Sequence, residues 1–242
     1  MQIARSRPFF SDMRLGDRLW WWDRDTGCRL VLSQPDVDPH LWGEYGRGAV
    51  RSYRRHGVER ALDRAALDTG NDTVMFFVAL DADDTVVAGV RAKGPLECAD
   101  DSHAVSEWQD QPGQDAVRKM IADRIPYGVL EMKSAWVSDD HPHKQELTDA
   151  IARSGSHMMA LLDIQFHMAT AASYVLNKWR SSGGIIAPIP ATPYPDARYQ
   201  TKLIWWDRST FSHHAQPHQA AKILTESQAL KSHLATASAL PR

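Results

Sequence analysis

The sequence predicts a mixed α/β (α+β) fold in which helices flank a central sheet. The run Thr73–Leu80 is apolar on both faces, as is typical of a buried central strand. Apolar residues at helical spacing, such as Val117, Met120 and Ile121, recur between the predicted strands. At 242 residues the chain is long enough to bury one sizeable core. These three observations together favour one principal domain.

The first predicted elements are a strand and two helices. Apolar and β-branched residues favour a strand over Cys28–Ser33. Asp38 followed by Pro39 has the pattern of an N-cap and a proline at the first helical position. A helix should therefore begin there and continue to a basic cluster that ends before Gly57. A shorter helix is expected over residues 59–67.

A β-hairpin and an insertion follow. The apolar strand leads through an acidic turn at residues 81–84 into a second strand over residues 85–92. The polar stretch at residues 97–112 is expected to be a loop. Helical spacing then predicts a helix over residues 114–125, which Pro126 ends.

The strand that contains Glu131 has the most informative pattern. Alternation places Glu131 and Lys133 on one face and Leu130, Met132 and Trp136 on the other. A carboxylate in the middle of a buried strand is costly unless it is paired or used. The strand is therefore predicted to form the wall of a site.

The rest of the chain predicts five more core elements and a tail. The core elements are a helix over residues 144–162, in which Gly155 is a weak point, a strand over 164–169, a helix over 172–179 and two strands over 184–189 and 199–206. Helical spacing over residues 217–234 predicts a peripheral helix that packs on the domain or on a partner. We therefore expect an N-terminal arm (1–27), a domain (28–210) and a C-terminal tail (211–242).

Composition limits the class of protein. Lys and Arg total 28 against 30 Asp and Glu, so there is no overall electrostatic attraction to nucleic acid. The two cysteines, Cys28 and Cys98, lie far apart in the sequence, which fits a reducing compartment and predicts a cytoplasmic location. The start of the chain lacks the apolar core of a secretory signal, and no run of about 18 apolar residues predicts a membrane span.

Four short motifs occur in this order of predicted elements: Arg55-His56-Gly57-Val58-Glu59, Val87-Ala88-Gly89-Val90-Arg91, Leu130-Glu131-Met132-Lys133-Ser134 and Trp179-Arg180-Ser181-Ser182-Gly183. With that element order, the chain resembles the GNAT-type acyltransferases. Within that superfamily, residues 53–208 are similar to the branch of N-acylhomoserine lactone and N-acyl amino acid synthases. The resemblance implies a mostly antiparallel sheet in which the strands at residues 128–137 and 164–169 splay apart to hold acyl-pantetheine.

The resemblance also implies the reaction and its residues. An N-acyltransferase would move an acyl group from acyl-CoA or acyl-carrier protein to a primary amine of a small molecule or amino acid, without a metal. The chemistry needs a base, a group that polarises the carbonyl and an acid for the thiolate. Glu131 would be the base and Tyr174 the acid, with Arg91 and Lys133 binding substrate. The implied coenzyme-binding residues are Trp136, Val137, Ser138, His143, Lys144 and Thr170, and main-chain amides near the first two would hold the carbonyl oxygen.

Three departures from the family pattern limit this assignment. The glycine-rich loop that binds pyrophosphate is missing, and Asp139 and Asp140 in its place oppose phosphate binding; residues 153–156 are an alternative loop. Trp179 stands where the family has tyrosine. Ser134 stands where the lactone synthases have arginine, so the lactone substrate is not carried over.

Simpler interpretations stand beside these. Glu131 could form a structural ion pair with Lys133, Arg91 or Lys93. The histidines at 141 and 143 resemble a metal cluster but are more typical of a solvent-facing loop. The basic cluster at residues 51–56 could dock an acidic carrier protein or simply end a helix. The tryptophans at residues 20–22 and 205–206 could form a lid over an acyl pocket or, as we favour, a seam between the arm and the sheet.

Two other functions also fit the sequence. The chain could be a protein lysine acetyltransferase, or a catalytically silent protein that binds a ligand or partner. An acyl-carrier protein and a second copy of the chain are further candidate partners.

Overall fold

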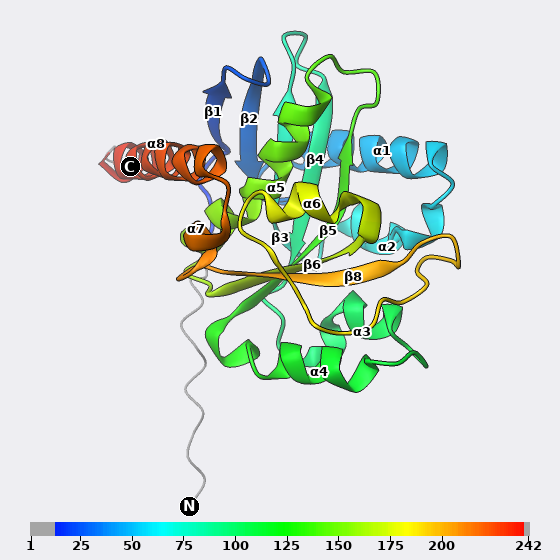
Figure 1. The fold of residues 1–242 in the computed structure, drawn as a ribbon. Coiled ribbons are helices and arrows are strands. Elements are labelled where there is room, and N and C mark those ends of the chain that lie inside the picture. The colour runs from blue at the N-terminus through cyan, green and yellow to red at the C-terminus, as the bar shows by residue number, and fades with distance from the viewer. Residues whose placement is uncertain (1–12, 240–242) are drawn as a thin grey trace, which may run out of the picture.

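The computed structural model describes residues 13–239, which form one sheet of eight strands flanked by helices (Figure 1). The strand order is β1-β2-β3-β4-β5-β6-β8-β7, and every neighbouring pair is antiparallel except β5 and β6. The strands are β1 (Leu19–Asp23), β2 (Cys28–Ser33), β3 (Thr73–Leu80), β4 (Val86–Lys93), β5 (Val129–Val137), β6 (Phe166–Ala172), β7 (Ile185–Ile186) and β8 (Thr201–Asp207). The predicted fold class, a mostly antiparallel sheet flanked by helices, is confirmed.

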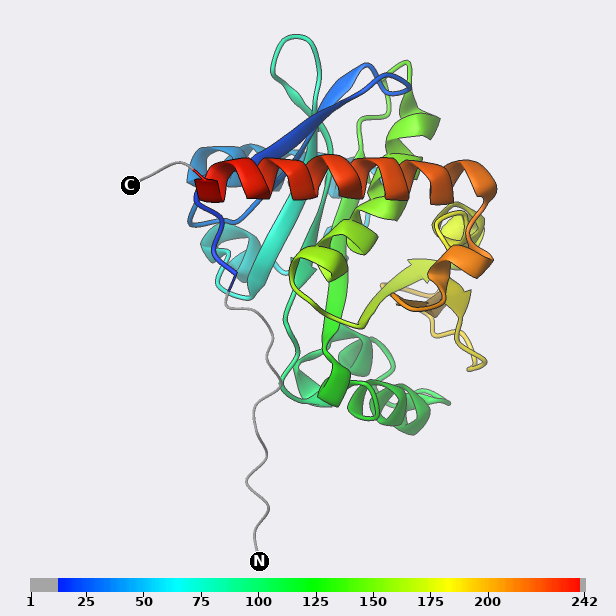
Figure 2. The same cartoon turned by 90° about the vertical axis from the view of Figure 1, so that its left-hand side faces the viewer.

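Helices cover both faces of the sheet. The helices are α1 (Pro39–Arg55), α2 (Arg64–Thr69), α3 (His103–Glu107), α4 (Gln114–Ala122), α5 (Lys144–Leu161), α6 (Leu176–Arg180), α7 (Phe211–His214) and α8 (Pro217–Ala239). One face of the central strands packs on α5, and the other packs on α1. Figure 2 shows α8 running across α5 and the edge strand β1. None of the helices within residues 13–239 has the length and apolar character of a transmembrane segment.

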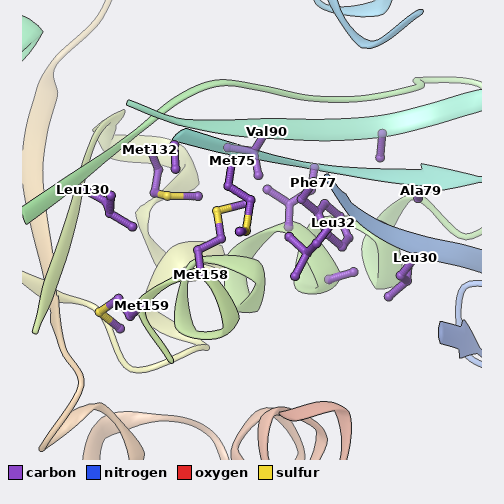
Figure 3. Packing of buried hydrophobic residues seen from close by; sticks show 14 of the residues in the cluster. Leu30, Leu32, Met75, Phe77, Ala79, Val90, Leu130, Met132, Met158 and Met159 are labelled. Atoms are coloured by element: carbon purple, nitrogen blue, oxygen red, sulfur yellow. The ribbon is translucent and has the colours of Figure 1, made fainter. Parts of the chain in front are cut away.

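The main apolar core lies between the sheet and α5. Figure 3 shows Met158 of α5 directed toward Met75 of β3, with Phe77 and Leu32 beside them. All four side chains are at most 1% exposed. Burial of such side chains stabilises the fold by about 1.5–3 kcal/mol each, so this contact fixes α5 against the sheet.

The predicted start of α1 is confirmed. The Asp38 side chain accepts a hydrogen bond from the Leu41 amide at 3.0 Å, and Pro39 is the first helical residue. Gly48 of α1 lies so close to β5 that a Cβ added there would be 1.9 Å from the Trp136 ring. The helix therefore packs directly on the strand that was predicted to form the site.

The prediction of a loop over residues 97–112 is wrong. A 3-10 turn (Ala99–Asp101) and helix α3 occupy this segment. Its apolar residues Ala104, Val105 and Trp108 are buried in a second cluster with α4. Their spacing is helical, but the pattern spans only a few residues. The polar residues around it therefore favoured the prediction of a loop.

Three predicted helices also differ in extent. Residues 59–67 divide into a 3-10 turn (Glu59–Ala61) and α2, because Asp63 caps a new helix by accepting from the Ala66 amide at 3.0 Å. The helix predicted over residues 172–179 is the short α6, since β6 extends to Ala172. The tail helix α8 runs beyond the predicted end at residue 234.

The two tryptophan motifs lie at different parts of the sheet. Within the predicted N-terminal arm, residues 19–23 form β1, and Trp21 packs beneath it against Phe77 and His157. The other motif belongs to β8, next to the opposite edge. Residues 1–12 of the predicted arm and 240–242 of the predicted tail lie outside the described residues.

Candidate active site

Strands β5 and β6 part in the middle of the sheet. Their parallel ladder runs from the pair Val129–Phe166 to the pair Met132–Ala169 and ends there. Beyond this point β5 continues along β4, while β6 continues along β8. The predicted splayed strand pair is therefore present, and we call the region beyond Met132 and Ala169, where the two strands diverge, the fork (Figure 1).

A β-bulge shapes the β5 side of the fork. Lys133 and Trp136 of β5 pair with Arg91 and Gly89 of β4, so β5 has one extra residue between these two pairs. Ser134 within this bulge has a left-handed φ of 54°. The Tyr45 hydroxyl of α1 donates to the Ser134 carbonyl at 3.0 Å and holds this turn of the backbone. The bulge reverses the alternation of side chains that follow it. Trp136 therefore lies on the α1 face with Glu131 and Lys133, and the prediction that it shares the face of Leu130 and Met132 is wrong.

The hydrogen-bond pattern of β4 and β5 orients the backbone amides at the fork. The Ser138 amide donates to the Val87 carbonyl at 2.7 Å. Because pair types alternate along an antiparallel ladder, the neighbouring pair Ala88–Val137 is a non-hydrogen-bonded pair. The Val137 amide therefore points away from β4, to the open side of the fork, whereas the Trp136 amide points toward β4.

Glu131 is fully buried and tied to helix α3. Its side chain is 0% exposed, and its carboxylate accepts from the amides of His103 at 2.9 Å and Ala104 at 3.1 Å. These amides belong to the first turn of α3, where a negative charge is favourable. Lys133 Nζ lies 3.9 Å from Glu131 Oε1, so the predicted alternative, a structural ion pair between Glu131 and Lys133, is present as well. The role of Glu131 as a base stays a prediction.

Lys133 binds a second carboxylate, from the other end of α3. Its Nζ lies 2.7 Å from Glu107 Oε1, and the two side chains are 8% and 1% exposed. Burial acts to lower the pKa of Lys133, but Glu107 and Glu131 raise it overall. Burial raises the pKa of Glu107, although the Lys133 ammonium opposes this shift. The three residues form what we call the fork cluster: two carboxylates that share one ammonium.

Sequence reasoning missed Glu107 because it lay in the segment predicted to be a loop. The helical spacing of Ala104, Val105 and Trp108 is the signal that could have placed it on a helix. Its partner Lys133 was among the predicted site residues, and so was Thr170. Thr170 is the first residue of β6 beyond the ladder.

The remaining predicted residues lie around or away from the fork. Arg91 is 1% exposed, and its guanidinium contacts Asp72 at 2.5 Å and Thr73 Oγ1 at 2.9 Å. Tyr174 is 76% exposed in a 3-10 turn after β6, with its ring centroid 6.4 Å from that of Tyr199. The structure thus brings Lys133 and Thr170 together at the fork, whereas Arg91 is bound by Asp72 and Thr73, and the roles of Arg91 and Tyr174 stay predictions.

The loop before α5 contains the predicted coenzyme-binding residues Ser138 and His143, and a third, Lys144, is the first residue of the helix. Its two aspartates are paired: Asp139 contacts Lys144, and Asp140 contacts Arg55 of α1 at 3.0 Å. These cations lower the pKa of both carboxyls. The basic end of α1 thus offsets acidic charge at the start of α5, which reduces the opposition to a bound phosphate.

The alternative phosphate loop at residues 153–156 is wrong. These four residues are buried in the interior of α5, and the Arg153 guanidinium binds Glu226 of α8. Within the described residues, no group of three or more His, Cys, Asp or Glu side chains could hold a metal ion.

No protein-family model matches the chain. It is 50% identical over 232 residues to uncharacterized proteins of Mycobacterium tuberculosis and Mycobacterium bovis, a match that covers 95% of this chain and 88% of each relative.

Three solved structures share the fold. FeeM, an N-acyl amino acid synthase from uncultured soil microbes, has a TM-score of 0.56 at 10% identity and covers 78% of this chain and 96% of its own. The AHL synthase LasI has a TM-score of 0.53 at 10% identity, with coverages of 75% and 91%. The CoA-dependent acyl-homoserine lactone synthase MesI has a TM-score of 0.52 at 13% identity, with coverages of 81% and 94%.

Proposed function

We propose that this chain, which belongs to the same family as the uncharacterized mycobacterial proteins and has the GNAT-type acyltransferase fold, is an N-acyltransferase. The reaction would move an acyl group from acyl-CoA or acyl-carrier protein to a primary amine of a small molecule or amino acid. The fork is the observation that carries the proposal, because it combines two diverging strands, a backbone amide directed away from the β4 neighbour and buried ionisable groups beside it. The acyltransferases named above, with the same fold, support it.

The thioester would lie in the fork as an extended segment beside β5. An extended chain can pair with free backbone groups of a strand edge, as an added strand does. The Val137 amide points to this side and would polarise the thioester carbonyl. The amine nitrogen then attacks the carbonyl carbon, the C–N bond forms and the C–S bond breaks. A carboxylate of the fork cluster would accept the amine proton.

The donor would extend from the fork toward the start of α5. We propose that the amides of the first turn of α5 bind a phosphate, with Ser138, His143 and Lys144 beside them. Lys144 pairs with Asp139 in this structure and would exchange that partner for phosphate. Trp136, Val137 and Thr170 would border the pantetheine, and Tyr174 would return a proton to the thiolate.

The proposal is tested by product formation. We expect the full-length protein, incubated with acyl-CoAs from acetyl to palmitoyl and with a panel of amino acids and amines, to give an amide that mass spectrometry identifies. Acyl-carrier-protein thioesters of the same chain lengths form a second donor panel. Acylation of protein lysines alone would favour the lysine acetyltransferase. If calorimetry detected no binding of any acyl-CoA or acyl carrier, the proposal would be wrong.

The Glu131→Gln variant addresses the residue that the sequence singled out. We expect lower turnover with little loss of donor binding, because the substitution removes charge from the fork without changing the predicted donor contacts. Turnover equal to that of the wild type across the pH range would remove Glu131 from the role of base. Calorimetric titration with the same acyl-CoA separates loss of donor binding from loss of chemistry.

A further inference from the structure

Glu107 reaches both strands at the point where they part. The last paired residues of the β5–β6 ladder are Met132 and Ala169, so Lys133 and Thr170 are the first residues beyond it. Glu107 Oε1 lies 2.7 Å from Lys133 Nζ, and the Thr170 hydroxyl lies close enough to the same carboxylate to lower its pKa. A side chain from α3 thus closes the inner end of the fork.

One oxygen of this carboxylate is buried without a partner. The Glu107 side chain is 1% exposed, and its Oε2 makes no hydrogen bond within the described part of the chain. The nearby Thr170 hydroxyl is not placed to donate to this oxygen. Buried carboxylate oxygens normally have partners because their desolvation is costly. The free oxygen at the fork therefore points to a donor supplied by a ligand.

The two carboxylates of the fork cluster differ in this respect. Both oxygens of Glu131 accept amide N–H groups of α3, so this carboxylate is engaged in holding that helix. Glu107 accepts from Lys133 through one oxygen and keeps the other free. With two carboxylates and one ammonium, the cluster has one excess negative charge, which attracts a cationic amine.

We infer that Glu107 is the catalytic residue that takes the proton from the acceptor amine, and that Glu131 is a positioning residue that holds α3. The inference rests on the proposed N-acyl transfer. The acceptor reacts as the neutral amine, after its ammonium form has released one proton to solvent. The amine lone pair forms the C–N bond, the thiolate leaves with the C–S electron pair, and Glu107 Oε2 receives the remaining amine proton. Tyr174 protonates the thiolate and regains a proton from solvent, and Glu107 releases its proton to solvent, so the products are an amide and a thiol and both residues are regenerated.

The ionisable groups around Glu107 define its pH dependence. Lys133 and Glu131 face it from β5, Tyr53 from α1 and Tyr194 from the loop before β8. Burial raises the pKa of Tyr53 to about 12 and also raises that of Tyr194, so neither tyrosine ionises near neutral pH. Burial raises the pKa of Glu107 itself. A base with a raised pKa is protonated and inactive at low pH, so kcat/KM should fall on the acidic side.

The test compares Glu107→Gln with the wild type, using the donor and amine that give most product. We expect kcat to fall by about 10²- to 10⁴-fold, the usual contribution of a general base. The dissociation constant of the acyl-CoA, measured by calorimetry, should stay within about twofold because Glu107 faces the amine side. The acidic limb of the kcat/KM profile should disappear.

Two further variants separate chemistry from folding. Glu107→Asp keeps a carboxylate but withdraws it by one methylene, so kcat should fall by about tenfold or more while the acidic limb remains. Trp108→Phe removes the indole bond to the Pro190 carbonyl at 3.2 Å, and should lower the unfolding temperature but keep the acidic limb. If the wild type forms no amide, the proposed function fails and this inference with it. If the wild type is active and Glu107→Gln keeps its kcat and its acidic limb, only the inference is wrong.

Discussion

Two groups of buried charges lie on opposite sides of the sheet and are built differently. The first, which we call the α8 cluster, joins α8 to α5 and β1 through Asp23, Arg153, His157, Lys222 and Glu226. The second is the fork cluster on the side of α1 and α3. Both bury carboxylates beside cations, but only the first gives each carboxylate a full set of partners.

Glu226 and Glu107 show the difference most clearly. Glu226 accepts from Arg153 Nε at 2.8 Å and from Arg153 Nη2 at 2.8 Å, and His157 Nε2 lies 2.8 Å away. Burial acts to raise the pKa of Glu226, but hydrogen bonds from His157 and Arg153 lower it to about 2. Burial instead raises the pKa of Glu107, which keeps one oxygen free. A carboxylate whose two oxygens both have hydrogen-bond partners holds neighbouring elements together. A carboxylate with one oxygen left without a partner can accept a proton there.

The largest effect on stability should come from breaking the α8 cluster. Arg153→Met leaves Glu226 buried without its main cation, so we expect the free energy of unfolding to fall by about 3–5 kcal/mol. Urea unfolding at neutral pH measures this change. The control is Arg54→Met, whose partner Glu59 is exposed, and the loss there should be at most about 1 kcal/mol. Equal losses in the two variants would show that the α8 cluster has no special structural role.

Acid should weaken the same cluster in a defined pH window. The pKa of Glu226 is lowered from 4.5 to about 2 in the folded protein, so its stabilisation is complete above about pH 4.5 and is lost as the pH falls toward about 2. The shift corresponds to about 3 kcal/mol. Urea unfolding of the wild type and of Glu226→Gln across this range measures it, and the two curves should converge at the acidic end.

The contribution of Glu107 to the free energy of unfolding should depend on pH in the opposite direction. Its folded-state pKa is raised, so its contribution is complete below the unfolded-state pKa and is lost as the pH rises through the folded-state pKa. Glu107→Gln should therefore change the pH dependence in the direction opposite to Glu226→Gln. A change of the same sign in both variants would contradict the contrast between the two clusters.

Local signals were enough for much of the fold. The apolar run that forms β3 and the strand Cys28–Ser33 were predicted to the residue, because a strand buried on both faces is a short continuous run of apolar residues. The start of α1 followed from Asp38 and Pro39 alone. The splayed pair came from the resemblance to a known superfamily, and the end of the β5–β6 ladder confirms it.

The features that depend on distant partners could not be predicted in this way. Helix α3 has only five residues, and Glu131 on β5 supplies the acceptors for its first amides. The bulge at Ser134 depends on the register against β4, and serine gives no sign of a left-handed backbone. For this reason the sequence identified Lys133 and Thr170 but missed Glu107, which reaches them only because α3 folds against β5.

The smallest predicted effect concerns α5, which packs on the sheet and carries Arg153 and His157 toward α8. Gly155 lies between these two residues, and a Cβ there would be 2.6 Å from the His167 ring. That ring cannot move easily, because it stacks on Trp206 at 4.3 Å between centroids. Gly155→Ala should therefore destabilise the protein by about 1–3 kcal/mol, as overpacking does. Urea unfolding measures this value.

Gly46→Ala on α1 is the matched control, since an added Cβ there meets nothing within 4 Å. Alanine in an unobstructed helical position should stabilise the protein by about 0.5–1 kcal/mol. The two glycines thus predict changes of opposite sign for the same substitution. If Gly155→Ala were also stabilising, α5 would have room to shift against β6, and the close packing of Gly155 on the His167 ring would not be a constraint on the fold.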